Sequence, residues 1–256
     1  IGPFPKRLPP ISKRPKLSTL ANAINYREIY EELDSLALAV YMPSSYVHPS
    51  KMGKYAKMGG GGNLTLGGRE TGVRRLMTTN LLKRLESSVC SFRLTLERVL
   101  AAMNAALETI DDYRRGLASG ASVADGDLPG GFDFDPDDES GFEVGGATKI
   151  LVEDMDWMSW ERDIEADVVV IEILISMVRD IDPAHDAKLI ELCEQIRGKS
   201  RGPINPGNRK VLVFTAFSDT ADYLYENVSA FAKRELGLEC AKVTGDGCAC
   251  TIKVVP

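Results

Sequence analysis

The sequence contains few of the residues that build metal sites and disulfide frameworks. Its 256 residues include five cysteines and two histidines. An odd number of widely spread thiols gives no legible disulfide pattern, so we expect reduced cysteines. His48 and His185 are far apart in the chain, so a zinc site would depend on Cys248 and Cys250, whose single-residue spacing suits few structural sites. We therefore predict no metal site.

Long hydrophobic runs are also absent. No apolar stretch reaches the roughly 18 residues that would span a bilayer. The first ten residues, IGPFPKRLPP, carry basic charge without the apolar core of a secretion signal. We expect a soluble, cytoplasmic protein with no membrane partner.

A phosphate-binding loop of the form Gly-x-x-x-x-Gly-Lys-Ser/Thr is missing as well. Gly198, Lys199 and Ser200 read Gly-Lys-Ser, but Cys193 stands where the first glycine is needed. No predicted strand precedes them, so the backbone amides that cradle nucleotide phosphates would not be positioned. We expect that this chain alone does not hydrolyse nucleotides.

Charge is distributed unevenly along the chain. Residues 1–100 hold 16 Lys/Arg against 7 Asp/Glu, residues 101–200 hold 8 against 24, and residues 201–256 hold 7 against 6. A basic segment favours a polyanion such as a nucleic-acid backbone, whereas an acidic middle is typical of a solvated tether or a charged helix face. Both interpretations of the basic end, nucleic-acid binding and a simple excess of charge, stay open.

The first 69 residues are predicted to be an extended and helical segment. Residues 1–17 are rich in proline, which disfavours helix, and are expected to be extended. Ser18 and Thr19 can cap a helix that covers residues 18–42, where apolar residues recur at helical spacing. The glycine-rich stretch that follows predicts a loop.

Residues 70–182 predict a long helical hairpin. Apolar residues recur at steps of three and four from Leu82 to Leu117, which corresponds to roughly 50 Å of helix. Such a stripe needs a partner, and residues 163–181 offer an apolar face for antiparallel packing. Because β-branched residues dominate 168–175, a strand there is the alternative.

An acidic, glycine-rich loop at residues 120–148 separates the two predicted helices. It has too little to bury to offset the entropy of ordering, so we expect a disordered or weakly ordered tether. Asp133, Asp135 and Asp137 alternate as in a calcium loop. Asp138 stands where the loop needs glycine, and Val144 where it needs glutamate, so we do not expect calcium binding.

Residues 183–256 predict a β-α-β unit after a short helix at 186–198. Residues 210–215, KVLVFT, have the pattern of a buried parallel strand, and Ser218 or Asp219 can cap a helix that runs to about Leu236. LECAKVTG predicts the second strand, and a right-handed crossover would make the two strands parallel neighbours. The fold class is therefore mixed α/β and predominantly helical. Ligands bind at the carboxyl ends of such strands.

Three stretches resemble one protein family. DAKLIELCEQIRG with NRKVLVFTAFSDTADYLYENV (186–228) resembles the start of the second RecA-like lobe of superfamily two helicases of the Swi/Snf type. TTNLLKRLESSVCSFRLTLERVL (78–100) resembles a helix of bacterial members, and FPKRLPP (4–10) the entry to their inter-lobe region. The three occur in the family's order, so the resemblance implies an internal fragment of a larger ATP-dependent helicase or translocase.

The resemblance also implies partners, cofactors and site residues. The parent would bind ATP and magnesium through parts not found in this sequence, including the first lobe and the remainder of the second, and no cofactor is expected in this fragment. DNA or RNA would be held by its backbone, without reading of sequence. The candidate nucleic-acid residues are Thr215, Phe217, Ser218, Thr244, Gly245, Lys83 and Arg84; none is assigned a catalytic role.

Each candidate residue also has a structural interpretation. Phe217 is equally typical of a core aromatic, and Ser218 of a helix cap. Lys83 and Arg84 fit a solvated helix face as well as a nucleic-acid groove. The alternative for the whole chain is a helical protein-interaction or scaffold module with a small α/β appendage and no motor activity.

Overall fold

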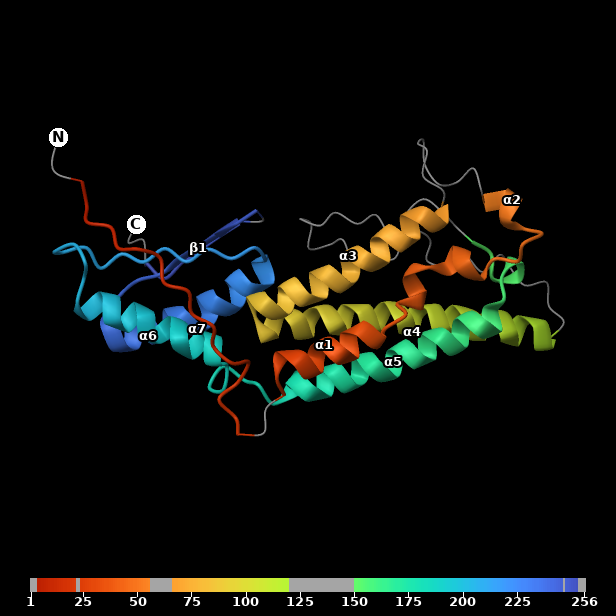
Figure 1. Ribbon diagram of the computed structural model, residues 1–256, viewed down its shortest axis with the longest axis horizontal. Coiled ribbons are helices and arrows are strands. Elements are labelled where there is room, and N and C mark those ends of the chain that lie inside the picture. Colours follow the sequence, from red (N-terminus) through yellow and green to blue (C-terminus); the bar gives the residue numbers. More distant parts are fainter. Residues whose placement is uncertain (1–3, 22–23, 56–65, 120–149, 246, 253–256) are drawn as a thin grey trace. The chain divides into compact units, whose positions relative to one another are not determined.

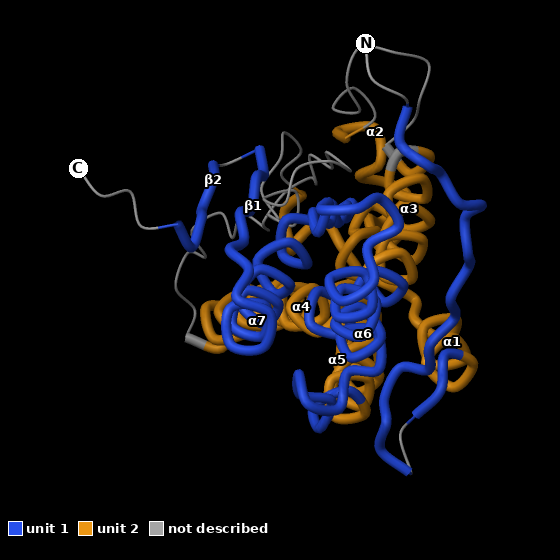
Figure 2. The backbone as a smooth tube through the Cα atoms, turned by 90° about the vertical axis from the view of Figure 1, so that its left-hand side faces the viewer, with its two compact units in different colours: residues 1–26, 85–91, 178–256 blue, residues 27–84, 92–177 orange. Residues whose placement is uncertain are grey.

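The computed structural model describes residues 4–21, 24–55, 66–119, 150–245 and 247–252. These residues divide into two compact units (Figure 2). Unit 1 comprises residues 1–26, 85–91 and 178–256, and unit 2 comprises residues 27–84 and 92–177. The predicted acidic tether at 120–148, with the aspartates considered for a calcium loop, lies entirely outside the described residues.

Unit 2 is helical. Its main helices are α1 (Tyr26–Ser35), α3 (Leu66–Ser87), α4 (Val89–Ser119) and α5 (Trp157–Arg179), whose end residues extend in part into unit 1. Shorter turns are η1 (Ala39–Tyr41), η2 (Pro43–Tyr46), α2 (Met52–Tyr55) and η3 (Val152–Asp154). Figure 1 shows α4 and α5 running in opposite directions.

The predicted antiparallel pairing of helices is confirmed by contacts between α4 and α5. The Arg114 guanidinium near the end of α4 forms an ion pair with Glu161 near the start of α5. The rings of Tyr113 and Trp157 meet edge to face with centroids 6.3 Å apart. The stretch 168–175 is helical, so the alternative of a strand is wrong.

The predicted apolar stripe forms the core of this unit. Phe92, Leu96, Val99, Met103 and Ile110 are fully or almost fully buried, whereas Leu117 at the end of the stripe is exposed. On α5 the buried positions recur at steps of four and three, as one face of a helix requires: Trp160, Ile164, Asp167, Ile171, Leu174 and Val178.

The single long helix expected from residue 70 onward is two helices instead. α3 ends at Ser87, and α4 begins at Val89. The Ser88 hydroxyl accepts a hydrogen bond from the Ser91 backbone N–H at 3.0 Å, which is the arrangement of a helix N-cap. A serine that caps a new helix therefore interrupts an apolar stripe that is continuous in the sequence.

The helix expected from Ser18 begins eight residues later, at Tyr26. Thr19 donates its backbone N–H to the His185 carbonyl at 3.0 Å, and Ser18 forms a β-bridge with Asp186. The amides that would start the helix are therefore engaged by a distant segment of unit 1.

Unit 1 contains α6 (Ala187–Arg201), α7 (Ser218–Leu236) and a two-stranded sheet of β1 (Ala241–Thr244) and β2 (Gly247–Cys250). α6 is capped by Asp186, whose carboxylate accepts from the Lys188 and Leu189 amides. α7 ends at Leu236 as predicted, and Gly237 takes the left-handed conformation at φ 61° that commonly ends helices. Ile196, Phe231 and Ala232 form the buried cluster between the helices.

The expected parallel β-α-β arrangement is not found among the described residues. β1 does form within LECAKVTG, but it pairs antiparallel with β2. Residues 210–215 form no strand, and Leu212 and Phe214 are 82% and 89% exposed instead of buried. The local hairpin closes a short loop, whereas a parallel pair needs a crossover of a dozen or more residues. The coarser prediction of a predominantly helical α/β chain is confirmed.

Candidate functional site

Four hydroxyl groups from distant parts of unit 1 gather at the start of α7. The Ser87 Oγ lies 2.8 Å from the Thr220 Oγ1 and 3.2 Å from the Thr215 Oγ1. The Ser88 Oγ lies 3.2 Å from the same Thr220 oxygen. We call Ser87, Ser88, Thr215 and Thr220 the hydroxyl cluster. It contains Thr215, the first nucleic-acid residue predicted from the sequence.

The local sequence explains the position of Thr215, Phe217 and Ser218. Phe217 occupies the N-cap position of α7, and Ser218 is its first helical residue, so the prediction of Ser218 or Asp219 as the cap is wrong. The Thr215 Oγ1 accepts from the Phe217 backbone N–H at 3.4 Å. The first amides of a helix carry partial positive charge, which favours anions near this end.

Thr220 is the residue on which the hydroxyl cluster is centred. Its side chain is buried, whereas Thr215 is exposed and Ser218 half-buried. A hydroxyl donates one hydrogen bond and accepts two, so a group of four can satisfy its buried members and still offer a hydrogen bond from its exposed edge. The arrangement can bind an oxygen of an anionic ligand. The four hydroxyl groups do not include a general base that could activate one of them as a nucleophile.

Beside this cluster, Lys188 joins α6 to the end of α3, and Asp186 joins α6 to α7. The Lys188 ammonium donates to the Glu86 carbonyl, and burial lowers the pKa of Lys188. The Tyr223 hydroxyl of α7 donates to the Asp186 Oδ2 at 3.0 Å. Burial, and then the negative charge of Asp186, raise the pKa of Tyr223. Sequence reasoning did not identify these ties, because they join residues far apart in the chain.

Thr244 and Gly245 lie at the end of β1 and are not joined to the hydroxyl cluster by any contact among the described residues. The Thr244 Oγ1 donates to the Gly247 carbonyl at 3.4 Å, across the turn of the hairpin. Thr244 is half-buried and Gly245 is exposed. Their prediction as a second strand-end contact assumed parallel strands that end on one edge.

Lys83 and Arg84 belong to unit 2, not to the unit that holds the hydroxyl cluster. Lys83 is exposed, as a groove or a solvated face requires. Arg84 is only 2% exposed, so its guanidinium is packed inside the protein instead of facing a nucleic acid. Helical spacing from the buried Leu81 and Leu85 could have identified this difference between neighbours.

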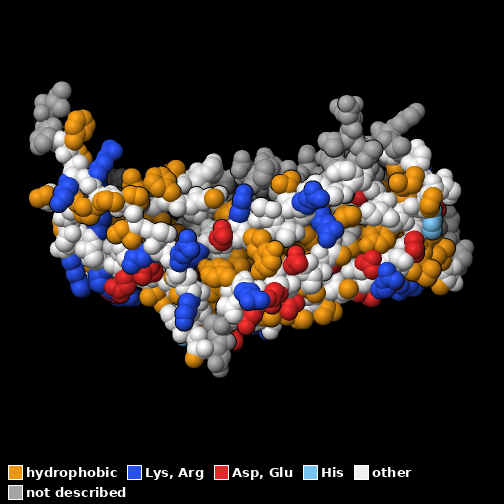
Figure 3. All heavy atoms as spheres, viewed as in Figure 1, with side chains coloured by type: hydrophobic (Ala, Val, Ile, Leu, Met, Phe, Trp, Pro, Cys, Tyr) orange, Lys and Arg blue, Asp and Glu red, His pale blue; other side chains and the backbone are white. Residues whose placement is uncertain are grey.

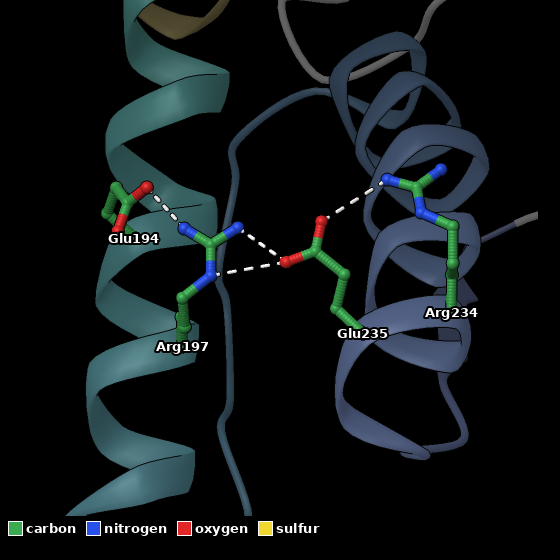
Figure 4. Close-up of polar contacts among 4 residues, drawn as sticks. All are labelled: Glu194, Arg197, Arg234 and Glu235. Atoms are coloured by element: carbon green, nitrogen blue, oxygen red, sulfur yellow. Dashed lines mark hydrogen bonds and ion pairs between the residues drawn. The ribbon is translucent and has the colours of Figure 1, made fainter.

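A network of four charged residues joins α6 to α7 (Figure 4). The Arg197 Nη2 donates to the Glu235 Oε2 at 2.6 Å, and Arg197 also forms an ion pair with Glu194. Arg234 reaches the other oxygen of Glu235 at 3.3 Å. These carboxylates, Glu194 first, raise the pKa of Arg197, and its guanidinium lies 5.0 Å from the centre of the Phe231 ring. The two arginines and two glutamates neutralise one another, so we interpret the network as structural.

The surface in Figure 3 has basic and acidic side chains interspersed in both units, without one continuous basic patch on the face drawn. Among the described residues, no three His, Cys, Asp or Glu side chains are grouped so that they could hold a metal ion. In the same part of the chain, no helix has both the length and the apolar character needed to cross a membrane.

Comparison with known proteins found no matching family model, no matching curated protein and no matching solved structure.

Proposed function

We propose that this chain is a non-catalytic part of an ATP-dependent nucleic-acid translocase of the Swi/Snf type. In this proposal unit 1 contributes contacts to the nucleic-acid backbone, and ATP and magnesium are bound by other parts of the parent protein. The proposal rests first on the three family-like stretches in the family's order. The structural observation that supports it is the hydroxyl cluster at the start of α7.

The cluster has the chemistry of a backbone contact. Thr215 and Ser218 present hydroxyl groups beside the first turn of a helix whose amides favour phosphate oxygens. Hydroxyls and amides position a nucleic acid without reading its bases. The expected binding is therefore independent of sequence and weak.

The finer part of the proposal concerns residues 210–215. We propose that in the parent they are a strand of a RecA-like parallel sheet. Among the described residues, the segment 211–214 makes no backbone hydrogen bond, and its apolar side chains Leu212, Val213 and Phe214 are exposed. Exposed apolar residues in an extended segment are typical of a strand whose neighbours come from elsewhere.

Fluorescence anisotropy with labelled single-stranded and double-stranded DNA and RNA of two unrelated sequences tests the nucleic-acid proposal. We expect similar affinities for both sequences and a steep loss of affinity between 50 and 500 mM salt, because bound cations are released from phosphates. Replacing Thr215 and Ser218 together with alanine should weaken binding about threefold to tenfold, as the loss of one or two hydrogen bonds predicts.

Thr109→Ala is the matched control, because among the described residues this threonine of α4 bonds to the Ala105 carbonyl of its own helix and to no other group. Its affinity should equal that of the wild type. Binding that is insensitive to salt, or equal in both alanine variants, would contradict the proposal. No binding at all at 50 mM salt would favour the protein-interaction module instead.

A further inference from the structure

The β1–β2 hairpin has one face turned toward the helices of unit 1 and one face turned away. Cys240 packs against the cluster of Ile196, Phe231 and Ala232, and Lys242 forms an ion pair with Asp222 of α7. Side chains alternate along a strand, so Ala241 and Val243 lie on the opposite face. Val243 is 81% exposed, which agrees with that alternation.

The register of the hairpin places two cysteines on this outer face. Ala241 pairs with Cys250, and Val243 pairs with Cys248. Paired residues share a face of the sheet, so both thiols lie beside Ala241 and Val243. Both cysteines are free and exposed, whereas Cys90, Cys193 and Cys240 are half-buried. The outer face therefore presents two neighbouring, solvent-accessible thiols that are not part of a disulfide.

The spacing of these thiols is unfavourable for a disulfide. Residues i and i+2 of a strand have Cα and Cβ atoms about 6.6 Å apart. A disulfide needs Cβ atoms roughly 3.5–4.5 Å apart, so its formation would require the strand to bend. A single metal ion bound between the two sulfurs allows them to stay farther apart than a disulfide does. Two metal–thiolate bonds of about 2.3 Å in line hold the sulfurs about 4.6 Å apart, which side-chain rotation can reach without moving the backbone.

We infer that Cys248 and Cys250 form a two-thiolate binding site for a soft, two-coordinate cation of the Cu(I) class. Soft thiolate ligands select such ions. Among the described residues, no third His, Cys, Asp or Glu joins the two thiols in a metal-binding group, which disfavours four-coordinate zinc. Each thiol releases its proton and forms one sulfur–metal bond, so two protons leave for each ion bound and the affinity rises with pH. The Cys250 thiol gives up a weak contact to the Ile252 carbonyl at 3.7 Å.

The test is anaerobic titration of the reduced chain with Cu(I) in competition with a chromogenic Cu(I) chelator, with native mass spectrometry to count the ions retained. The wild type should retain one ion. Cys248→Ser and Cys250→Ser should each lose it, with a fall in affinity larger than the roughly 10–100-fold that loss of an outer-shell partner costs. Because the side chains at positions 248 and 250 face solvent, the thermal unfolding of these variants should match that of the wild type.

Cys240→Ala is the matched control, because this cysteine lies one residue before β1 and packs against the helices of unit 1. It should retain one ion with unchanged affinity. Retention of the ion by Cys248→Ser or Cys250→Ser would overturn the inference, and so would its loss from Cys240→Ala or a wild type that yields all Cu(I) to the chelator. None of these results bears on nucleic-acid binding, which the inference does not use.

Discussion

The two units of this chain bury their residues in different ways. In unit 2 a continuous stripe of large apolar side chains is sealed from solvent, and buried carboxylates are satisfied by backbone amides. Around α6 and α7 of unit 1 the buried cluster is small and is bordered by half-buried residues. The apolar residues Leu212, Val213 and Phe214 stay exposed beside it. The helices of unit 2 therefore cover a continuous core, whereas the described residues of unit 1 leave apolar side chains beside their cluster exposed.

The largest difference should follow removal of one phenylalanine from each unit. Phe92 of α4 is fully buried, and Phe231 of α7 lies at a partly open cluster. We expect Phe92→Ala to lower the free energy of unfolding by about 4 kcal/mol, and Phe231→Ala by about 2 kcal/mol, since a cavity at an open site collapses more easily.

Urea unfolding monitored by tryptophan fluorescence reports on unit 2, because both tryptophans, Trp157 and Trp160, belong to it. Circular dichroism or hydrogen exchange in α6 and α7 reports on unit 1. Equal losses of unfolding free energy for the two variants would contradict the predicted difference between the cores of the two units.

A buried aspartate in each unit gives the next largest contrast. In unit 2 Asp167 accepts the backbone N–H groups of Ala37 and Ala39, both at 2.8 Å. It thereby holds Leu38 in the left-handed conformation, at φ 53°. Asp167→Ala should lower the free energy of unfolding by about 3 kcal/mol. Two backbone amides lose their acceptor, and Leu38 loses the hydrogen bonds that hold its strained conformation.

The counterpart in unit 1 is Asp186, the N-cap of α6. Asp186→Ala should cost about 2 kcal/mol, because it removes a helix cap and also the acceptor of the Tyr223 hydroxyl. Asp167→Asn retains one acceptor and should recover part of the stability in thermal unfolding. A loss from Asp186→Ala as large as that from Asp167→Ala would mean that the two roles are equivalent.

Glu70 of unit 2 and Glu235 of unit 1 should contribute pH dependences of stability that have opposite signs. Burial raises the pKa of Glu70 in unit 2 to about 7, against hydrogen bonds from Ser44 that lower it. The folded state therefore binds this proton more tightly than the unfolded state. The stabilisation is complete below the ordinary value of 4.5 and is lost as pH rises through 7. Between pH 5.5 and 8 the loss should be about 2 kcal/mol.

Carboxylates of unit 1 shift the other way. Hydrogen bonds with Arg197 lower the pKa of Glu235, and a hydrogen bond with His185 lowers that of Asp182. Their contribution is present above the unfolded pKa and is lost as pH falls through the folded one.

Glu70→Gln should abolish the loss of stability between pH 5.5 and 8 that tryptophan fluorescence reports. Glu108→Gln, at an exposed residue, is its control. A persistent loss in Glu70→Gln would show that another group causes it.

Sequence patterns predicted the helices well because helix formation is local. Spacing alone identified most of the buried positions of α4, and Gly237 marks the end of α7 at Leu236. The candidate site was predicted only in part. Thr215 does lie at the start of α7, but its neighbours Ser87 and Ser88 come from about 130 residues earlier in the chain. No local pattern connects them.

The sequence by itself determined the helical segments and their apolar faces, since a period of three to four residues and a capping residue act within a few turns. Tertiary structure alone decided the partners. It holds Leu38 with a carboxylate from α5, and it pairs β1 with β2 instead of residues 210–215. Strand pairing and burial depend on which distant groups satisfy a given amide or cover a given side chain, and that choice is not encoded in any short stretch of the chain.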